Sequence, residues 1–148
     1  MVRTVYAAEV TARARIFSYD VSLDRDWAAQ SALGGTTIPN EEEPWTPEHL
    51  VLAGLCRCIL TSFRYHARRA GHEPVATAAA HGVVTRREDD GRFAFVEIRV
   101  DLDVMLDGQP TPPSVGDLVM KGERDCFVGA SLRVKPDYHW TVNGEELS

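Results

Sequence analysis

The sequence has no apolar run that approaches the roughly 20 residues needed to span a bilayer, so we expect no membrane partner. Its first ten residues, MVRTVYAAEV, lack a long apolar segment, and we therefore expect no secretory signal. The formal net charge of −6 is not the basic excess that nucleic-acid binding requires. A phosphate-binding glycine loop, a Gly-x-Ser-x-Gly elbow and paired catalytic carboxylates are also missing. These absences disfavour nucleic-acid partners and several common classes of enzyme.

Cysteine is scarce as well, with three residues at Cys56, Cys58 and Cys126. An odd count fits a disulfide framework poorly and fits a cytoplasmic protein with one structural and two reactive thiols better. Cys56 and Cys58 lie two residues apart in a predicted helix, so they do not share a helix face and form a poor chelate or disulfide. Because free cysteine is among the most buried side chains, a purely structural role for the thiols is the alternative.

The five histidines show no metal-ligand spacing, and we interpret them as solvated or interface residues. We therefore expect neither a metal nor another cofactor.

The pattern of the chain predicts a single α+β domain over residues 1–148, because chains of this length usually form one core. The expected order is β-β-α-β-β-α-β, with elements at 4–14, 16–23, 47 to about 70, 75–87, 92–106, 114–125 and 131–142. The first two strands should form a hairpin. The strand at 92–106 alternates apolar and charged residues, which predicts that one sheet face meets water. Pro136 interrupts the last strand and favours a position at the sheet edge.

The first long helix has clear start and stop signals. Thr46 is a good N-cap, Pro47 suits the first helical position, and Gly71 ends the helix. Its first half, LVLAGLCRCIL, is apolar nearly all round, which is typical of a segment buried in a core or a subunit interface. Glu48 lies ten residues before Cys58, or about 15 Å along the helix axis. If both belong to one site, a second chain or a bent path must supply one of them.

The segment TPEHLVLAGLCRC resembles the start of the central helix in the OsmC/Ohr family of thiol peroxidases. In that family a glutamate opens the helix and the peroxidatic cysteine follows ten positions later, which matches Glu48 and Cys58. A second cysteine follows the second long helix, which matches Cys126 in CFVGASL. The Leu-Gly-Gly of residues 33–35 is similar to the Ohr branch. The resemblance covers nearly the whole chain, and Cys56 is extra to it.

The resemblance implies an intertwined homodimer with its central helices buried in the middle. It also implies that the Cys58 thiolate attacks an organic peroxide or hydrogen peroxide and becomes a sulfenic acid. Cys126 then condenses with the sulfenic acid to form a disulfide, which a dithiol reductant, with a lipoyl-type dithiol as one candidate, reduces. An arginine paired with Glu48 activates the thiolate; Arg15 is the nearest match, with Arg13 and Arg25 as alternatives.

We further expect an apolar pocket that favours hydrophobic peroxides, lined by Leu50, Leu55, Phe63 and Phe127. Two other functions remain open on the same scaffold. One is a non-catalytic binding protein in which the thiols are merely buried. The other is a redox sensor that forms the same disulfide and turns over poorly.

Overall fold

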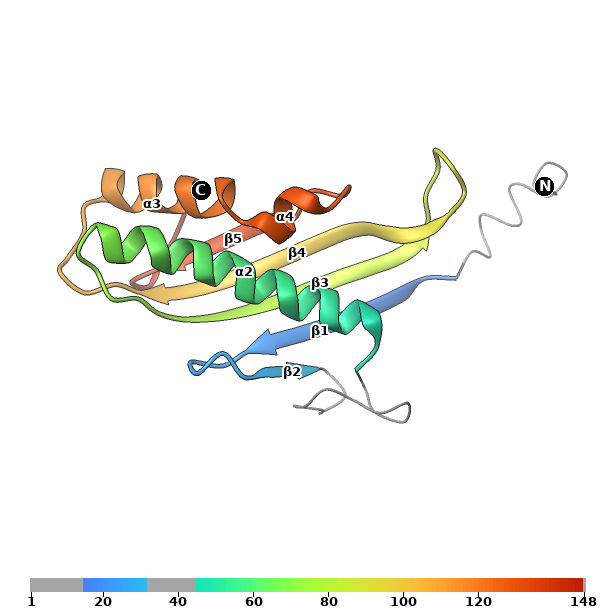
Figure 1. The fold of residues 1–148 in the computed structure, drawn as a ribbon, viewed down its shortest axis with the longest axis horizontal. Helices are drawn as coiled ribbons and strands as arrows, with labels where there is room; N and C mark the ends of the chain where they lie inside the picture. The colour runs from blue at the N-terminus through green and yellow to red at the C-terminus, as the bar shows by residue number, and fades with distance from the viewer. Residues whose placement is uncertain (1–14, 32–44, 148) are drawn as a thin grey trace, which may run out of the picture.

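In the computed structural model, which describes residues 15–31 and 45–147, a six-stranded sheet carries three helices on one face (Figure 1). The helices are α2 (Pro47–Arg69), α3 (Pro112–Arg124) and α4 (Phe127–Ser131). The strands are β1 (Phe17–Leu23), β2 (Ala29–Ser31), β3 (Val75–Arg86), β4 (Phe93–Met105), β5 (Asp137–Val142) and β6 (Glu145–Glu146). The predicted α+β class is confirmed. Within the described ranges, no helix combines the length and apolar character needed to cross a membrane.

The strands lie in the order β2-β1-β3-β4-β5-β6. All neighbours are antiparallel except β4 and β5, which run parallel. A parallel pair needs a crossover connection, and α3 and α4 supply it here. This crossover returns the chain over the same sheet face that α2 covers (Figure 1).

The sheet has one apolar and one charged face, as the alternation in β4 predicts. The inward side chains of β4 are almost fully buried: Ile98, Val100, Leu102 and Val104. Their neighbours Arg99, Asp101 and Asp103 are exposed on the opposite face. The strand beneath α2 presents small inward side chains instead, namely Ala76, Ala78 and Ala80. Small residues leave room for the bulky apolar face of α2 to pack closely on the sheet.

The predicted boundaries of α2 are confirmed. Thr46 is the N-cap, Pro47 occupies the first turn, and the chain leaves the helix through Gly71 at φ +89°. His49 completes a capping box: its backbone N–H donates to Thr46 Oγ1, and Thr46 N donates to its Nδ1 at 3.1 Å. His49 is therefore buried, which corrects the interpretation of every histidine as a solvated or interface residue.

The segment after Cys126 differs from the expectation of one strand over 131–142. Residues 127–131 form α4, and β5 begins only at Asp137, directly after Pro136. Proline removes a ladder donor, so the strand starts after it rather than running through it. The expected edge position is also wrong, because β5 lies between β4 and the two-residue β6.

The other boundaries agree closely with the prediction. β1, β3 and β4 match their predicted strands to within one residue at each end. The second long helix begins at Pro112 rather than at 114, because Thr111 is its N-cap and the two prolines occupy the first turn. The expected strand at 4–14, and with it the opening hairpin, lies outside the described residues, as does most of the predicted loop at 33–47.

We predict that Phe63→Ala strongly destabilises the fold. Phe63 is 1% exposed and packs against Trp140 with ring centroids 4.9 Å apart, so truncation opens a cavity between α2 and β5. A Phe→Ala change of this kind costs about 3–5 kcal/mol of unfolding free energy. Met120→Ala on α3 is the control, because Met120 is 58% exposed and its loss should cost within about 0.5 kcal/mol. Urea denaturation measures both, and equal midpoints would contradict the assigned core.

Candidate functional site

The thiols of Cys58 and Cys126 meet between α2 and the short segment that joins α3 to α4. The two thiols lie close together, and Cys58 raises the pKa of Cys126. The backbone N–H of Val128 also donates to Cys58 Sγ at 3.4 Å. Cys58 is partly exposed, whereas Cys126 is fully buried. The fold thus brings together two thiols that are 68 residues apart and gives them different access to solvent.

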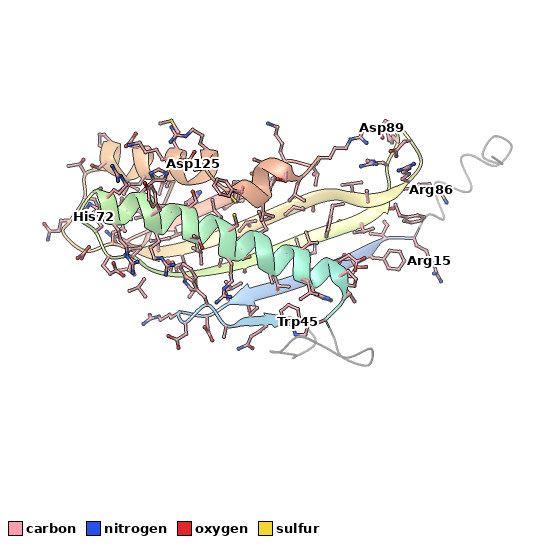
Figure 2. The ribbon with its side chains drawn as sticks, in the orientation of Figure 1. Arg15, Trp45, His72, Arg86, Asp89 and Asp125 are labelled. Atoms are coloured by element: carbon pink, nitrogen blue, oxygen red, sulfur yellow. The ribbon has the colours of Figure 1, made fainter. Side chains whose placement is uncertain are left out.

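Two further contacts between α2 and α3 hold this segment in place. Ser62 Oγ donates to the carbonyl oxygen of Gly122 at 2.8 Å in the buried helix interface. His66 Nε2 lies 2.7 Å from Asp125 Oδ2, directly before Cys126 in the chain. Figure 2 shows Asp125 at the end of α3, above α2. These two contacts with α2 fix the end of α3, where the chain turns at Asp125. Cys126 then lies in the core at the start of α4.

Burial raises the pKa of Cys126, and the neighbouring Cys58 raises it further. The backbone amide of Gly129 and the hydroxyl group of Tyr138 oppose this effect, because hydrogen-bond donors favour the thiolate and lower the pKa. Burial and the nearby Cys126 raise the pKa of Tyr138 as well. Val128, Gly129 and Tyr138 are site residues that sequence reasoning missed, since no motif connects β5 to the thiols.

Cys56 is the thiol that faces the core. It is fully buried, and burial raises its pKa to about 12. Cys126 also acts on it electrostatically, so Cys126 lies close to both helix cysteines. A thiol with a pKa of about 12 is almost entirely protonated near neutral pH, so Cys56 is a poor nucleophile. The i, i+2 spacing therefore separates one fully buried thiol, Cys56, from one partly exposed thiol, Cys58, on α2.

Glu48 and Arg15 stay a predicted pair. Glu48 lies in the first turn of α2, where its charge acts on Tyr19 and His49. Arg15 precedes β1, and its carbonyl oxygen accepts a hydrogen bond from Thr85 at 2.8 Å. Figure 2 shows Arg15 at the end of the sheet near Arg86. Among the residues that the structure describes, neither Glu48 nor Arg15 takes part in an ion pair.

The structure describes one of the two alternative arginines. Arg13 lies outside the described residues. Arg25 lines a separate cavity of about 580 Å³ together with Arg57, Arg64 and Trp27.

The four residues expected to bind substrate divide into two groups. Leu50 and Phe127 are exposed, at 42% and 79%. Leu55 and Phe63 are buried in the core, so a ligand reaches them only if the structure opens. Their role in binding remains a prediction. Across the described part of the chain, no group of three or more His, Cys, Asp or Glu side chains is arranged to hold a metal ion.

Comparison with known protein families shows the family to which this chain belongs. The model of a family described as OsmC-like protein matches residues 40–140, which is more than half of the chain. The chain belongs to the OsmC-like family. No curated protein matches this OsmC-like chain.

Solved structures share the OsmC-like fold at low sequence identity. An OsmC-like protein of unknown function from Vibrio cholerae is 13% identical, with a TM-score of 0.59, and the match covers 87% of this chain and 99% of that one. An OsmC-like protein from Mycoplasma pneumoniae is 14% identical, with a TM-score of 0.55 and coverage of 88% and 96%. The organic hydroperoxide resistance protein OhrB of Bacillus subtilis is 21% identical, with a TM-score of 0.52 and coverage of 86% and 97%. These similarities show the fold.

We predict that the three thiols of the OsmC-like chain differ in their rates of alkylation. Cys58 should react first with iodoacetamide at pH 8, because it is partly exposed, and Cys56 should stay protected, because it is buried with a pKa of about 12. Peptide mass spectrometry over time measures each site, and the same reaction in urea should label all three. Labelling of Cys56 as fast as Cys58 in the folded protein would contradict this arrangement.

Proposed function

We propose that this OsmC-like chain is a thiol peroxidase that reduces organic hydroperoxides or hydrogen peroxide. The observation that carries the proposal is the contact between a partly exposed thiol, Cys58, and a fully buried one, Cys126. A peroxidatic thiol must meet its substrate, whereas a resolving thiol needs only to reach the first sulfur. Family membership and the fold shared with an organic hydroperoxide resistance protein support the same class of reaction.

The proposed reaction has three steps: attack on the peroxide, disulfide formation and reduction. The Cys58 thiolate attacks the peroxide, the O–O bond breaks, and the alkoxide leaves and takes up a proton, so that Cys58 becomes a sulfenic acid. The Cys126 thiolate then attacks the Cys58 sulfur, an S–S bond forms, and hydroxide leaves as water after protonation. A dithiol reductant, with a lipoyl-type dithiol as one candidate, supplies two electrons and restores both thiols. A reducing compartment such as the cytoplasm suits a chain with three free thiols.

The contacts around Cys58 support its role as the nucleophile. The N–H of Val128 points at its sulfur, where it can stabilise negative charge in the thiolate. Cys56 lacks both access and a favourable pKa. The exposed side chains of Leu50 and Phe127, on α2 and α4, suit contact with an apolar peroxide.

We further propose that the functional unit is a homodimer in which the Glu48–Arg15 pair completes the site. The 15 Å offset along α2 prevents Glu48 from reaching the Cys58 of its own helix, whereas a second protomer could supply it. Large apolar side chains are exposed on α2, α4, β1 and β4, including Leu50, Val51, Phe127, Phe17, Phe93 and Val96. Such side chains are suited to a subunit interface, where a second protomer would cover them.

The peroxidase proposal predicts distinct outcomes for the three cysteine variants. Wild type should consume cumene hydroperoxide with a dithiol reductant over many turnovers. Cys58→Ser should lose this activity, because the attacking sulfur is gone. Cys126→Ser should retain one turnover and then become overoxidised at Cys58. Cys56→Ser should keep nearly full activity as the matched control.

Peroxide loss and intact mass measure these outcomes. No peroxide loss in wild type, or loss that survives Cys58→Ser, would overturn the assignment. A single turnover in wild type that yields the disulfide and then stops would favour the redox sensor instead.

The dimer proposal predicts that wild type sediments with twice the mass of one chain. Val51→Asp should shift the protein toward the monomer, because it places a charge in an exposed apolar patch on α2. Met120→Asp changes an exposed apolar residue of α3 in the same way and should leave the mass unchanged. Analytical ultracentrifugation distinguishes these results, and a monomeric wild type at micromolar concentration would contradict the dimer.

A further inference from the structure

We propose that the Tyr138 hydroxyl group is a catalytic hydrogen-bond donor to the Cys126 sulfur in the step that forms the disulfide, and that Gly129 is needed to admit it. This inference rests on the proposed function, because it assigns a third participant to the Cys58–Cys126 reaction. Nothing in the sequence pattern connects Tyr138 to the thiols, since it lies in β5, and only the fold brings it to Cys126.

The geometry at Gly129 carries the argument. A methyl group built on Gly129 would lie 2.4 Å from the Tyr138 hydroxyl oxygen and 3.3 Å from Cys126 Sγ. The hydroxyl group and the sulfur therefore flank the same small space, which only a residue without a side chain leaves open. Leu55 closes the third side, with Cδ1 at 3.6 Å from the same point. Tyr138 and Cys126 therefore lie close together, and each shifts the pKa of the other.

The surroundings of Tyr138 suit a hydroxyl group that donates a hydrogen bond and keeps its proton. Burial and the adjacent Cys126 hold the pKa of Tyr138 well above its usual range, so the phenol stays protonated at physiological pH. A protonated phenol can donate to the Cys126 thiolate and lower the pKa of the thiol, against the burial that raises it. A cavity of about 730 Å³ between α3, α4 and β5 is lined in part by Gly129 and Tyr138.

The donor acts when Cys126 needs to be ionised. Cys126 loses its proton, its thiolate attacks the sulfur of the Cys58 sulfenic acid, the S–S bond forms, and hydroxide leaves and is protonated to water. Tyr138 keeps its proton throughout, so it changes neither the atoms nor the electrons of the reaction. It stabilises the charge that the buried sulfur must carry before attack.

Other ionisable groups surround the pair and must be considered in a pH profile. Cys56 and Cys58 face Cys126 from α2, and the charge of Glu123 on α3 acts on Tyr138. His66 pairs with Asp125, the residue before Cys126. These groups are the same in wild type and in the variants below, so the ratio of rates at each pH isolates the hydroxyl group.

We predict that Tyr138→Phe slows disulfide formation roughly three- to tenfold below the pKa of Cys126, because one charge-assisted hydrogen bond is lost. The difference in rate should shrink as pH rises. In Tyr138→Phe the Cys126 thiol has a higher pKa and ionises only at higher pH, but the thiolate that it then forms is more nucleophilic. Gly129→Ala keeps the phenol but displaces it, and should show the same profile. Tyr65→Phe, which removes an exposed hydroxyl group on α2, is the matched control and should match wild type.

The rates are measured by acid quench and intact mass after two different oxidants, cumene hydroperoxide and diamide. Diamide modifies Cys58 without a peroxide, and attack by Cys126 then expels the reduced diamide and forms the same disulfide. A defect with both oxidants supports the inference. A defect with diamide in a protein that does not consume peroxide supports Tyr138 and overturns the peroxidase.

Wild-type rates for Tyr138→Phe at every pH would overturn the inference, and so would a defect that does not change with pH. Urea denaturation of each variant shows that it is folded. If Gly129→Ala fails to fold, Tyr138→Phe alone tests the inference, because removing one hydroxyl oxygen leaves the ring packing in place.

Discussion

The packing of α2 on the sheet is the constraint on which the rest of the structure depends. Its apolar side chains pack on the small alanines of β3, and another side of α2 packs against α3 and α4. The Ser62–Gly122 hydrogen bond and the His66–Asp125 pair set the position of α3 on α2. Because α4 follows at once, the same contacts determine where Cys126 lies relative to Cys58. A shift of α2 by one turn would separate the two thiols.

Burial gives the three chemically identical thiols different access to solvent, and it raises the pKa of Cys56 and of Cys126. Removing a thiol from water disfavours its charged form, so the fully buried Cys56 is held as a neutral thiol. Cys126 is also buried, but the Gly129 amide and the Tyr138 hydroxyl group offset part of that cost. Cys58 keeps access to solvent at the boundary between α2 and α4. The proposed order of reaction, in which the accessible thiol reacts first and the buried one resolves, follows from this gradient of access.

Long periodic elements were predictable from the sequence, and short or non-local ones were not. The caps of α2 and the alternation in β4 are local signals, and both boundaries agree with the structure. The five-residue α4 has too few residues for a helical period, so its segment was interpreted as part of a strand. The interior position of β5 depends on a parallel crossover to β4, which no local pattern specifies. His49 was interpreted as a solvated or interface residue, because its capping role depends on the folded geometry at the start of α2.

The sequence by itself determined that α2 exists, where it begins and ends, and that Cys56 and Cys58 cannot share one face, because these are consequences of caps and helical period. It also pointed to Glu48, Cys58 and Cys126 through spacing that resembles a known family. Only the tertiary structure decided that Cys126 lies beside Cys58, that Cys56 is fully buried, and that Tyr138 and Gly129 complete the surroundings of Cys126. Those relations depend on side chains from α2, α4 and β5 meeting in one buried place, and burial and proximity are properties of the folded chain alone.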